Sequence, residues 1–455
     1  MIQKTKTEIQ KDLDNITTHK VFKMSLSIFV ELLLQMLVGN IDQFMISQYS
    51  QNSVAAIGNG NQIMNIIIIV LNVMSSATTV LLTQYIGAKN KKMMSETCSA
   101  STMIILLAGT LATGVVVLFH RQIFTMMHVS PEIMEETCRY MKIIGSFIFI
   151  QGLYLNMASI IRSFSMMRQV MFVSVIMNLL NIIGNAILLN GFFGLPKLGI
   201  TGVAISTNFS KCVGLLLLII IFVRKIDAKI AFRYLKPFPF QTVKRILYIA
   251  LPSGGEGLSY NMSQLVILSM VNTFGTAVVT TKVYASMIAN VSYVYAIAIA
   301  QATQIVVGYM LGAGKKEQVS KRVWSTVRIS FMVCVGVTIF TYLNSDFIYG
   351  IFTHEPAILE LGKKILLIEI LLECGRAMNI VLVRILCSTG DIIVPIAVGI
   401  VCQWFVAALL SYVFGVVLGL GLQGIWIAMA LDECSRGIIF IFRFKSGAWK
   451  KKRVI

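Results

Sequence analysis

The sequence predicts an all-α polytopic membrane protein, with twelve transmembrane helices in two six-helix lobes related by a pseudo-two-fold axis along the membrane normal. The first observation is composition: 56% of residues are hydrophobic, 13% are charged and the mean hydropathy is +0.80. A soluble chain of 455 residues needs more charge than this to cover its surface. The second is a series of apolar segments long enough to cross a bilayer core of about 30 Å. The third is an internal repeat.

The apolar segments define twelve expected spans. The connections between them are short, apart from the basic connector 224–245 and the outer loops near 120–137 and 344–361. The spans are 21–47, 55–86, 97–119, 138–160, 169–191, 198–223, 246–272, 280–310, 323–343, 362–386, 392–415 and 421–442. The expected domains are an N-terminal tail (1–20), an N-lobe (21–223), a basic linker (224–245), a C-lobe (246–442) and a basic C-terminal tail (443–455). Pro252 and Pro395 fall close to expected helix starts, where a missing N–H does little harm.

The first span carries carboxylates that an apolar helix normally excludes. Glu31, Gln35 and Asp42 fall within about 40° of one another on a helical wheel and so form one polar stripe. A carboxylate at mid-membrane costs at least about 2.5 kcal/mol, and such groups usually face a bundle interior or a wet cavity. Two interpretations remain: the stripe helps the helices to pack, or Asp42 faces a water-accessible path and exchanges a cation.

The distribution of basic residues predicts the orientation. Of the 39 lysines and arginines, 29 fall on one side of the expected spans and 7 on the other, while Lys211, Arg376 and Arg436 lie inside spans. The rule that basic loops stay inside makes the first side cytoplasmic, with both termini there. The first apolar segment is full length without a cleavage site, so it is expected to remain as a span. This distribution also accounts for the net charge of +19 without a nucleic-acid partner.

The two halves of the chain repeat each other weakly. The sequence LPKLGITGVAIS at 195–206 corresponds to VLGLGLQGIWIA at 417–428, an offset of 222 residues. RSFSMMR at 162 corresponds to RILCSTGD at 384, again an offset of 222 residues. YIGAKNKK at 85 corresponds to MLGAGKK at 310, an offset of 225 residues. Six spans per repeat is an even number, so both halves have the same orientation. Two such lobes with a site between them are typical of transporters.

The N-lobe concentrates neutral polar groups on two helices. On span 5 they lie within about 60° on the wheel and are Ser174, Asn178, Asn181 and Asn185. A similar stripe on span 2 comprises Asn65, Asn72, Ser76 and Thr83. These groups can hydrogen-bond helices to one another. Together with Asp42, the amide oxygens can also bind a small cation. Alternatively, Asp42 is a carboxyl that takes up and releases a proton, and the amides are its hydrogen-bond partners. The coupling ion is therefore Na⁺ or H⁺, no other cofactor is expected, and the sequence does not choose between the two.

The C-lobe is more highly charged. Its candidates form three groups: Glu256, Tyr260 and Ser263 on span 7; Glu369, Glu373 and Arg376 on span 10; and Asp432, Glu433 and Arg436 on span 12. The spacing of three and four residues between acids and arginines predicts ion pairs on spans 10 and 12. The span 12 group is interpreted as a gating or structural cluster. Glu256 has no evident local partner and is the functional candidate of this lobe, while the role of Lys211, at the repeat position of Glu433, stays open.

Other chemistries find no support in the sequence. The eight cysteines include no Cys-x-x-Cys pair, and the four histidines lie in the tail or expected loops, so neither a metal site nor a disulfide framework is expected. No nucleophile–base pair or phosphate-binding loop lies within the spans, so an enzyme is not expected. A channel or receptor fits the composition, but the duplication favours a transporter.

Six segments resemble the multidrug and toxic compound extrusion (MATE) family, in particular its bacterial DinF- and NorM-like members. They are GNIDQFMISQYSQNSVAAIGNGNQI at 39–63, NLLNIIGNAILLNGFFGLPKLGITGVAIST at 178–207, LPSGGEGLSYNMSQLVI at 251–267, GYMLGAGKKE at 308–317, ECGRAMNIVLVRILCSTGD at 373–391 and the end DECSRG…RFKSGAWKKK. The resemblance implies two six-helix lobes around a V-shaped cavity. It also implies export of amphipathic, often cationic organic compounds, driven by inward flow of Na⁺ or H⁺.

The resemblance also assigns roles to individual residues. Asp42 matches the span 1 aspartate of the family, and Asn181 and Asn185 match the span 5 asparagines of its first-lobe cation site. Glu256 matches a glutamate four residues after the span 7 proline. Where some NorM-like members have a Na⁺-binding aspartate on span 10, this chain has Arg376, so the cation site is expected in the N-lobe.

The main alternative is a lipid-linked saccharide flippase of the wider superfamily. A flippase is expected to have a cationic groove for pyrophosphate, whereas the embedded charges of spans 1, 7 and 10 are mostly acidic. The preferred interpretation is a multi-pass protein of the bacterial plasma membrane, acting as a monomer on small organic cations.

Overall fold

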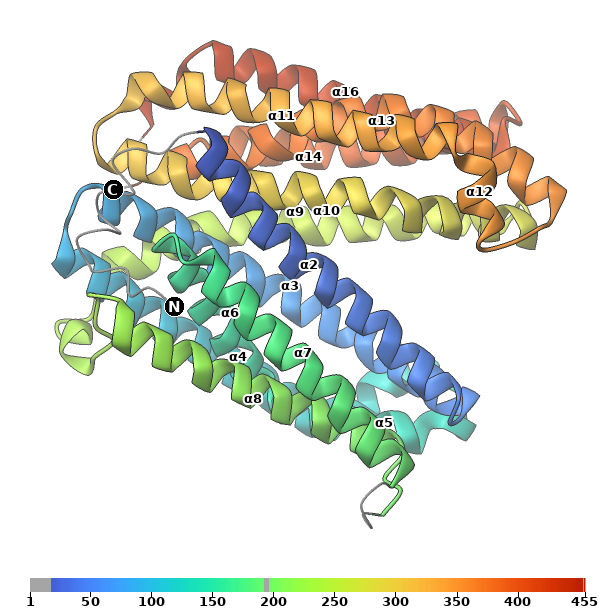
Figure 1. Ribbon diagram of the computed structural model, residues 1–455, viewed down its shortest axis with the longest axis horizontal. Coiled ribbons are helices and arrows are strands. Elements are labelled where there is room, and N and C mark those ends of the chain that lie inside the picture. The colour runs from blue at the N-terminus through green and yellow to red at the C-terminus, as the bar shows by residue number, and fades with distance from the viewer. Residues whose placement is uncertain (1–17, 192–195, 453, 455) are drawn as a thin grey trace. The chain divides into compact units, whose positions relative to one another are not determined.

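Long helices make up nearly all of the computed structural model, which describes residues 18–191, 196–452 and 454 (Figure 1). The chain divides into two compact units. One contains Val30–Leu251, and the other contains Pro252–Ile455 together with the stretch that ends at Phe29. The first helix is therefore shared, because its beginning belongs to the second unit and its remainder to the first.

The first unit packs its helices side by side (Figure 1, blue to green). Its elements are α2 (Thr18–Ser47), α3 (Gln51–Gly87), α4 (Lys91–Met126), α5 (Pro131–Gly145), α6 (Ile148–Ser163), α7 (Met167–Asn190), α8 (Ile200–Lys225) and the short η2 (Phe232–Leu235). Helix α6 contacts α3, α4 and α8, and α7 lies along α8. Ser50 and Asn90 cap α3 and α4 through their side chains, which satisfies backbone N–H groups at the helix starts.

The second unit contains α9 (Phe240–Asn272), most of which follows the boundary at Pro252, and the helices after it. These are α10 (Thr276–Gly312), α11 (Lys316–Leu343), α12 (Ser345–Gly350), α13 (Pro356–Thr389), α14 (Ile393–Cys402), α15 (Leu409–Ser411), α16 (Gly421–Lys445) and η5 (Ala448–Lys451). A π-helical segment, η3 (Gln403–Ala408), joins α14 to α15, and a second one, η4 (Tyr412–Val417), follows α15.

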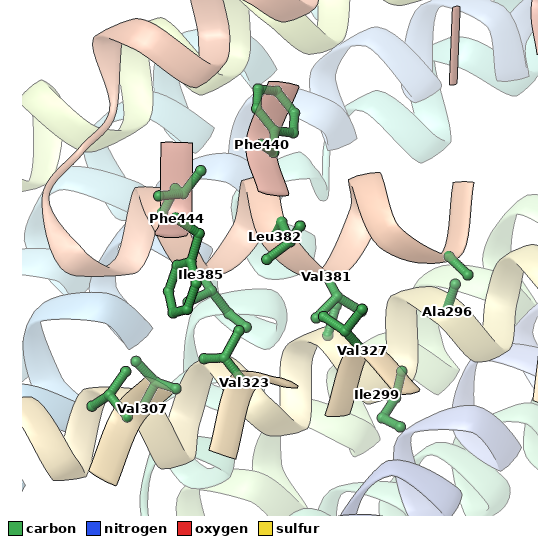
Figure 2. Packing of buried hydrophobic residues seen from close by; sticks show 14 of the residues in the cluster. Ala296, Ile299, Val307, Val323, Val327, Val381, Leu382, Ile385, Phe440 and Phe444 are labelled. Carbon is green, nitrogen blue, oxygen red and sulfur yellow. The ribbon is translucent and has the colours of Figure 1, made fainter. Parts of the chain in front are cut away.

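Helix α13 lies at the centre of the second unit and packs against α10, α11 and α16. Figure 2 shows how Val381 and Ile385 of α13 meet Val323 and Val327 of α11 and Phe444 of α16. All five side chains are buried. A stacked pair formed by Phe444 and Trp449 closes one end of this core, with ring centroids 5.2 Å apart.

Eight helices among the described residues are long and apolar enough to cross a membrane, and the pair α5 and α6 would make a ninth. Helices α9, α13 and α16 are also long, but polar and charged side chains interrupt their apolar surface. With these three, the helical segments correspond to the twelve expected spans. Hydropathy alone underestimates the number because side chains buried among helices need not be apolar.

The structure corrects three details of the expected layout. Span 4 is not one helix over 138–160, because α5 and α6 are bent by 46° at a break after Gly145. The outer segments 120–137 and 344–361 are largely helical rather than loops. Finally, α9 begins at Phe240, so Pro252 lies inside the helix and not near its start. A proline there removes one helical hydrogen bond, which hydropathy patterns do not reveal.

Helices α13 and α16 approach each other closely at Gly375, and we predict that a methyl group there destabilises the second unit. A Cβ at Gly375 would lie 2.4 Å from the backbone nitrogen of Cys434. Overpacking of this kind costs about 1–3 kcal/mol, so Gly375→Ala should lower the thermal unfolding midpoint of the purified protein. Gly336→Ala on α11 is the control, since nothing lies within 4 Å of its added Cβ. Equal midpoints for the two variants would contradict the prediction.

Candidate functional site

Asp42 on α2 accepts hydrogen bonds from two asparagines of α7. Asn185 Nδ2 donates to Asp42 Oδ1 over 2.7 Å. In the amide orientation that satisfies both of its neighbours, Asn181 Nδ2 lies 3.1 Å from each carboxylate oxygen, and its amide oxygen accepts from Thr207 Oγ1 at 3.1 Å. Both asparagines are buried and Asp42 is half-buried. Three of the sequence-predicted residues therefore form one cluster.

Close packing of α7 against α8 holds this cluster in place. Asn181 and Asn185 are one helical turn apart and so share a face of α7. Ser206 Oγ of α8 donates to the backbone oxygen of Asn181 at 2.9 Å. Between the two asparagines, a Cβ at Gly184 would lie 2.3 Å from that same hydroxyl, so the approach of the helices requires glycine.

Asn178 lies on α7 before this cluster, and the structure does not bring it into hydrogen-bond contact with Asp42. Its side chain is buried, and its Nδ2 has no partner among the described residues. The amide oxygen of Asn185 is likewise buried without a donor. Carboxylate and amide oxygens are hard ligands that suit a small hard cation. In the described part of the chain, no group of three or more His, Cys, Asp or Glu side chains could hold a metal ion.

Glu31, the other acid on α2, is neutralised in a different way. Its Oε1 lies 2.8 Å from Arg162 NH1 of α6, and the two side chains are 2% and 15% exposed. Arg162 follows the expected span 4 (138–160), and the structure makes it the partner of a buried acid. Asp42 has no such partner, because no cationic group of a described residue lies within 4.0 Å of it. The polar stripe predicted on α2 therefore contains one ion pair and one acid held by neutral amides.

In the second unit, Glu256 contacts a residue that the sequence did not single out. Gln403 Nε2 donates to Glu256 Oε1 over 2.7 Å. Gln403 begins the π-helical segment η3, and its backbone oxygen accepts from Ser263 Oγ at 3.0 Å. A π-helical turn displaces backbone groups from their usual partners and often marks functional sites. No sequence motif announces such a turn, so this contact could not be predicted. The hydroxyl of Tyr260, one turn from Glu256, forms no hydrogen bond with a described residue.

The remaining acids of the second unit form the ion pairs that their spacing predicts. Arg376 pairs with Glu373 and, at 3.0 Å, with Glu369. Arg436 pairs with Asp432 and, at 3.2 Å, with Glu433. Two neutral donors that sequence reasoning missed complete the cluster: Trp426 Nε1 donates to Glu369 over 2.6 Å, and Asn379 Nδ2 donates to Glu433 over 2.7 Å. Breaking such buried pairs is costly because it leaves an uncompensated charge.

Membrane-crossing helices with buried polar clusters, in two halves that repeat each other, define the class of multi-span membrane transporters. The sequence profile of the MatE family matches residues 27–187 and again 252–413. The chain therefore belongs to the MatE family, and each half carries one copy of the family's repeat. Membership in a transporter family also means that the protein is not an enzyme.

Individual proteins agree with this assignment along almost the whole chain. The chain is 32% identical over 446 residues to "Uncharacterized transporter YisQ" of Bacillus subtilis, covering 98% of each sequence. It is 26% identical over 451 residues to "Probable multidrug resistance protein NorM" of Thermotoga maritima, covering 98% of this chain and 95% of the other. A crystal structure described as MATE in the straight conformation matches with a TM-score of 0.90 at 22% identity, over 99% of this chain and 100% of the other. This likeness confirms the predicted twelve-helix fold.

We predict that Arg162→Met lowers the free energy of unfolding by about 3–5 kcal/mol, because it leaves the Glu31 carboxylate buried and unpaired. The double variant Arg162→Met/Glu31→Gln removes that charge and should recover at least half of the loss. Thermal unfolding of both purified variants in one detergent measures this. A double variant no more stable than the single one would show that the pair is not what stabilises this contact.

Proposed function

We propose that the protein is a cation-coupled secondary antiporter of the bacterial plasma membrane. In this proposal, inward flow of Na⁺ or H⁺ drives export of amphipathic organic cations by alternating access. Both termini lie in the cytoplasm, the two repeats correspond to N- and C-lobes joined by the basic linker, and the transporter acts as a monomer. The names of curated relatives as multidrug resistance proteins support this class of cargo.

The proposal rests on the negative charge of Asp42, which neutral amides stabilise in place of a cationic side chain. Asp42 lies in a membrane helix, yet only the side-chain amides of Asn181 and Asn185 donate to its carboxylate among the described residues. A carboxylate in a bilayer is costly unless it pairs with a charge or reaches water. An acid that is half-buried and has no resident ion pair can accept a mobile cation and release it again. Asn178, Asn181 and Asn185 are the proposed neutral partners of that cation.

Glu256 is the proposed second-lobe candidate for contact with cargo or cation. Among the described residues, its hydrogen-bond partner is the neutral amide of Gln403, in contrast to the arginine-paired acids Glu369 and Glu373. We assign Arg376 and its acids, like the group of Arg436, a structural or gating role. Asp42 and Glu256, the two acids that accept from neutral amides, favour a positively charged cargo.

Asp42→Asn should abolish coupled efflux while leaving the protein folded. The amide keeps the size of the side chain but cannot exchange a cation. Ethidium efflux from cells expressing equal amounts of each variant measures the effect. Asp346→Asn is the matched control, because Asp346 is an exposed acid whose partner is the surface residue Lys363. Wild-type efflux by the Asp42 variant would remove this residue from the mechanism.

Efflux in proteoliposomes should follow one imposed cation gradient. We expect either an inward Na⁺ gradient at equal pH or an inward H⁺ gradient without Na⁺ to drive ethidium transport. Collapsing that gradient with the matching ionophore should stop transport. Transport that persists at the same rate with neither gradient would contradict coupling to a cation.

A further inference from the structure

Lys211 is a basic residue in the interior of the membrane helix α8, where a charged side chain is costly. It lies one helical turn after Thr207, whose hydroxyl hydrogen-bonds Asn181. Residues four apart on a helix lie on the same face, so Lys211 belongs to the face of α8 that carries the Asp42 cluster. Its side chain is half-buried.

The contacts of Lys211 are unusual for a lysine within a membrane span. No described residue forms a hydrogen bond with its ammonium group or an ion pair with it within 4.0 Å. Among the described residues, the acid whose charge acts on Lys211 is Asp42 of α2. Conversely, among the described residues Lys211 is the cation whose charge acts on Asp42, and Tyr140 of α5 is a further titratable group that faces this acid. The lysine is therefore near its natural counter-ion without being bound to it.

The long, flexible side chain of Lys211 allows its ammonium group to move relative to Asp42. An ammonium group on a four-carbon stem can move by several ångströms through rotamer changes alone. An isolated carboxylate with a free cation site is more costly in the membrane than one accompanied by a nearby positive charge. A lysine held close to Asp42, but outside ion-pair distance, leaves the carboxylate oxygens accessible and still lowers their attraction for another cation.

We propose that Lys211 is a tethered cation that competes with the coupling ion for Asp42. This inference rests on the proposed function, because it assigns Asp42 as the site of ion exchange. When the coupling ion leaves, the ammonium group moves towards Asp42 and compensates its charge. When the ion returns, it displaces the ammonium group. Lys211 thus keeps the affinity for the ion low enough for release in each cycle, and it acts through Asp42 as a positioning residue.

Removing the positive charge of Lys211 should change both the affinity for the coupling ion and the maximal rate of efflux. In proteoliposomes driven by the coupling ion, Lys211→Met should lower the half-saturating concentration of that ion about tenfold. For protons, this is an upward shift of about one pH unit in the midpoint of the pH profile. The maximal efflux rate should fall as well, because the ion is released more slowly. Lys211→Arg keeps the charge and should retain the wild-type half-saturating concentration.

Lys282→Met is the matched control. Lys282 is also a half-buried lysine on a membrane helix, α10, but no ionised group among the described residues acts on it. It should leave the half-saturating concentration unchanged. Should Lys211→Met fail to accumulate, Lys211→Gln carries the same expectation. An unchanged or increased half-saturating concentration for the neutral variant, with normal folding, would overturn the proposal.

A double variant separates this proposal from the proposed function. Binding of the coupling ion should raise the thermal unfolding midpoint, and Lys211→Met should show this shift at about tenfold lower ion concentration. In an Asp42→Asn background, the Lys211 substitution should have no effect on the ion dependence. An ion dependence that still responds to Lys211 without Asp42 would refute the coupling between them. Efflux that survives Asp42→Asn would instead refute the assignment of Asp42, whatever Lys211 does.

Discussion

The structure depends on how each acid within the membrane is compensated. Hydrocarbon cannot solvate a carboxylate, so every such group needs a positive partner, a hydrogen-bond donor or access to water. Glu31, Glu369 and Glu433 satisfy this requirement with an arginine from the same unit. Asp42 satisfies it with neutral amides. Fixed ion pairs stabilise the helix bundle, whereas an acid without one can exchange its partner.

Helix α2 combines both kinds of acid and so connects stability with exchange. The pair between Glu31 and Arg162 joins α2 to α6. Asp42 follows eleven residues later, about 16 Å along the helix at about 1.5 Å per residue. The ion pair can therefore fix the register of α2 against its neighbours while the contacts of Asp42 change. Because the beginning of α2 belongs to the second unit, this one helix runs from one unit into the other.

The two repeats have kept the same helical scaffold but use different chemistry. In the first unit, the site combines Asp42 with amides and with Lys211, which forms no ion pair with a described residue. In the second, α13 and α16 bring arginines and acids into one buried network, supported by Trp426 and Asn379. At corresponding positions of the two repeats, the first unit has the basic Lys211 and the second has the acidic Glu433. A network of fixed charges resists rearrangement, so we expect ion exchange in the first unit.

The sequence alone determined the membrane fold, the internal repeat and the residues that could not be ordinary lipid-facing side chains, because hydropathy and helical spacing are local properties. It also predicted the arginine–acid pairs within α13 and α16, since residues three or four apart on a helix are neighbours. Only the tertiary structure decided which acid is paired across helices. The partnership of Glu31 with Arg162 joins residues 131 positions apart, and the contact of Glu256 with Gln403 depends on a π-helical turn. Such contacts follow from the packing of whole helices, which no local pattern specifies.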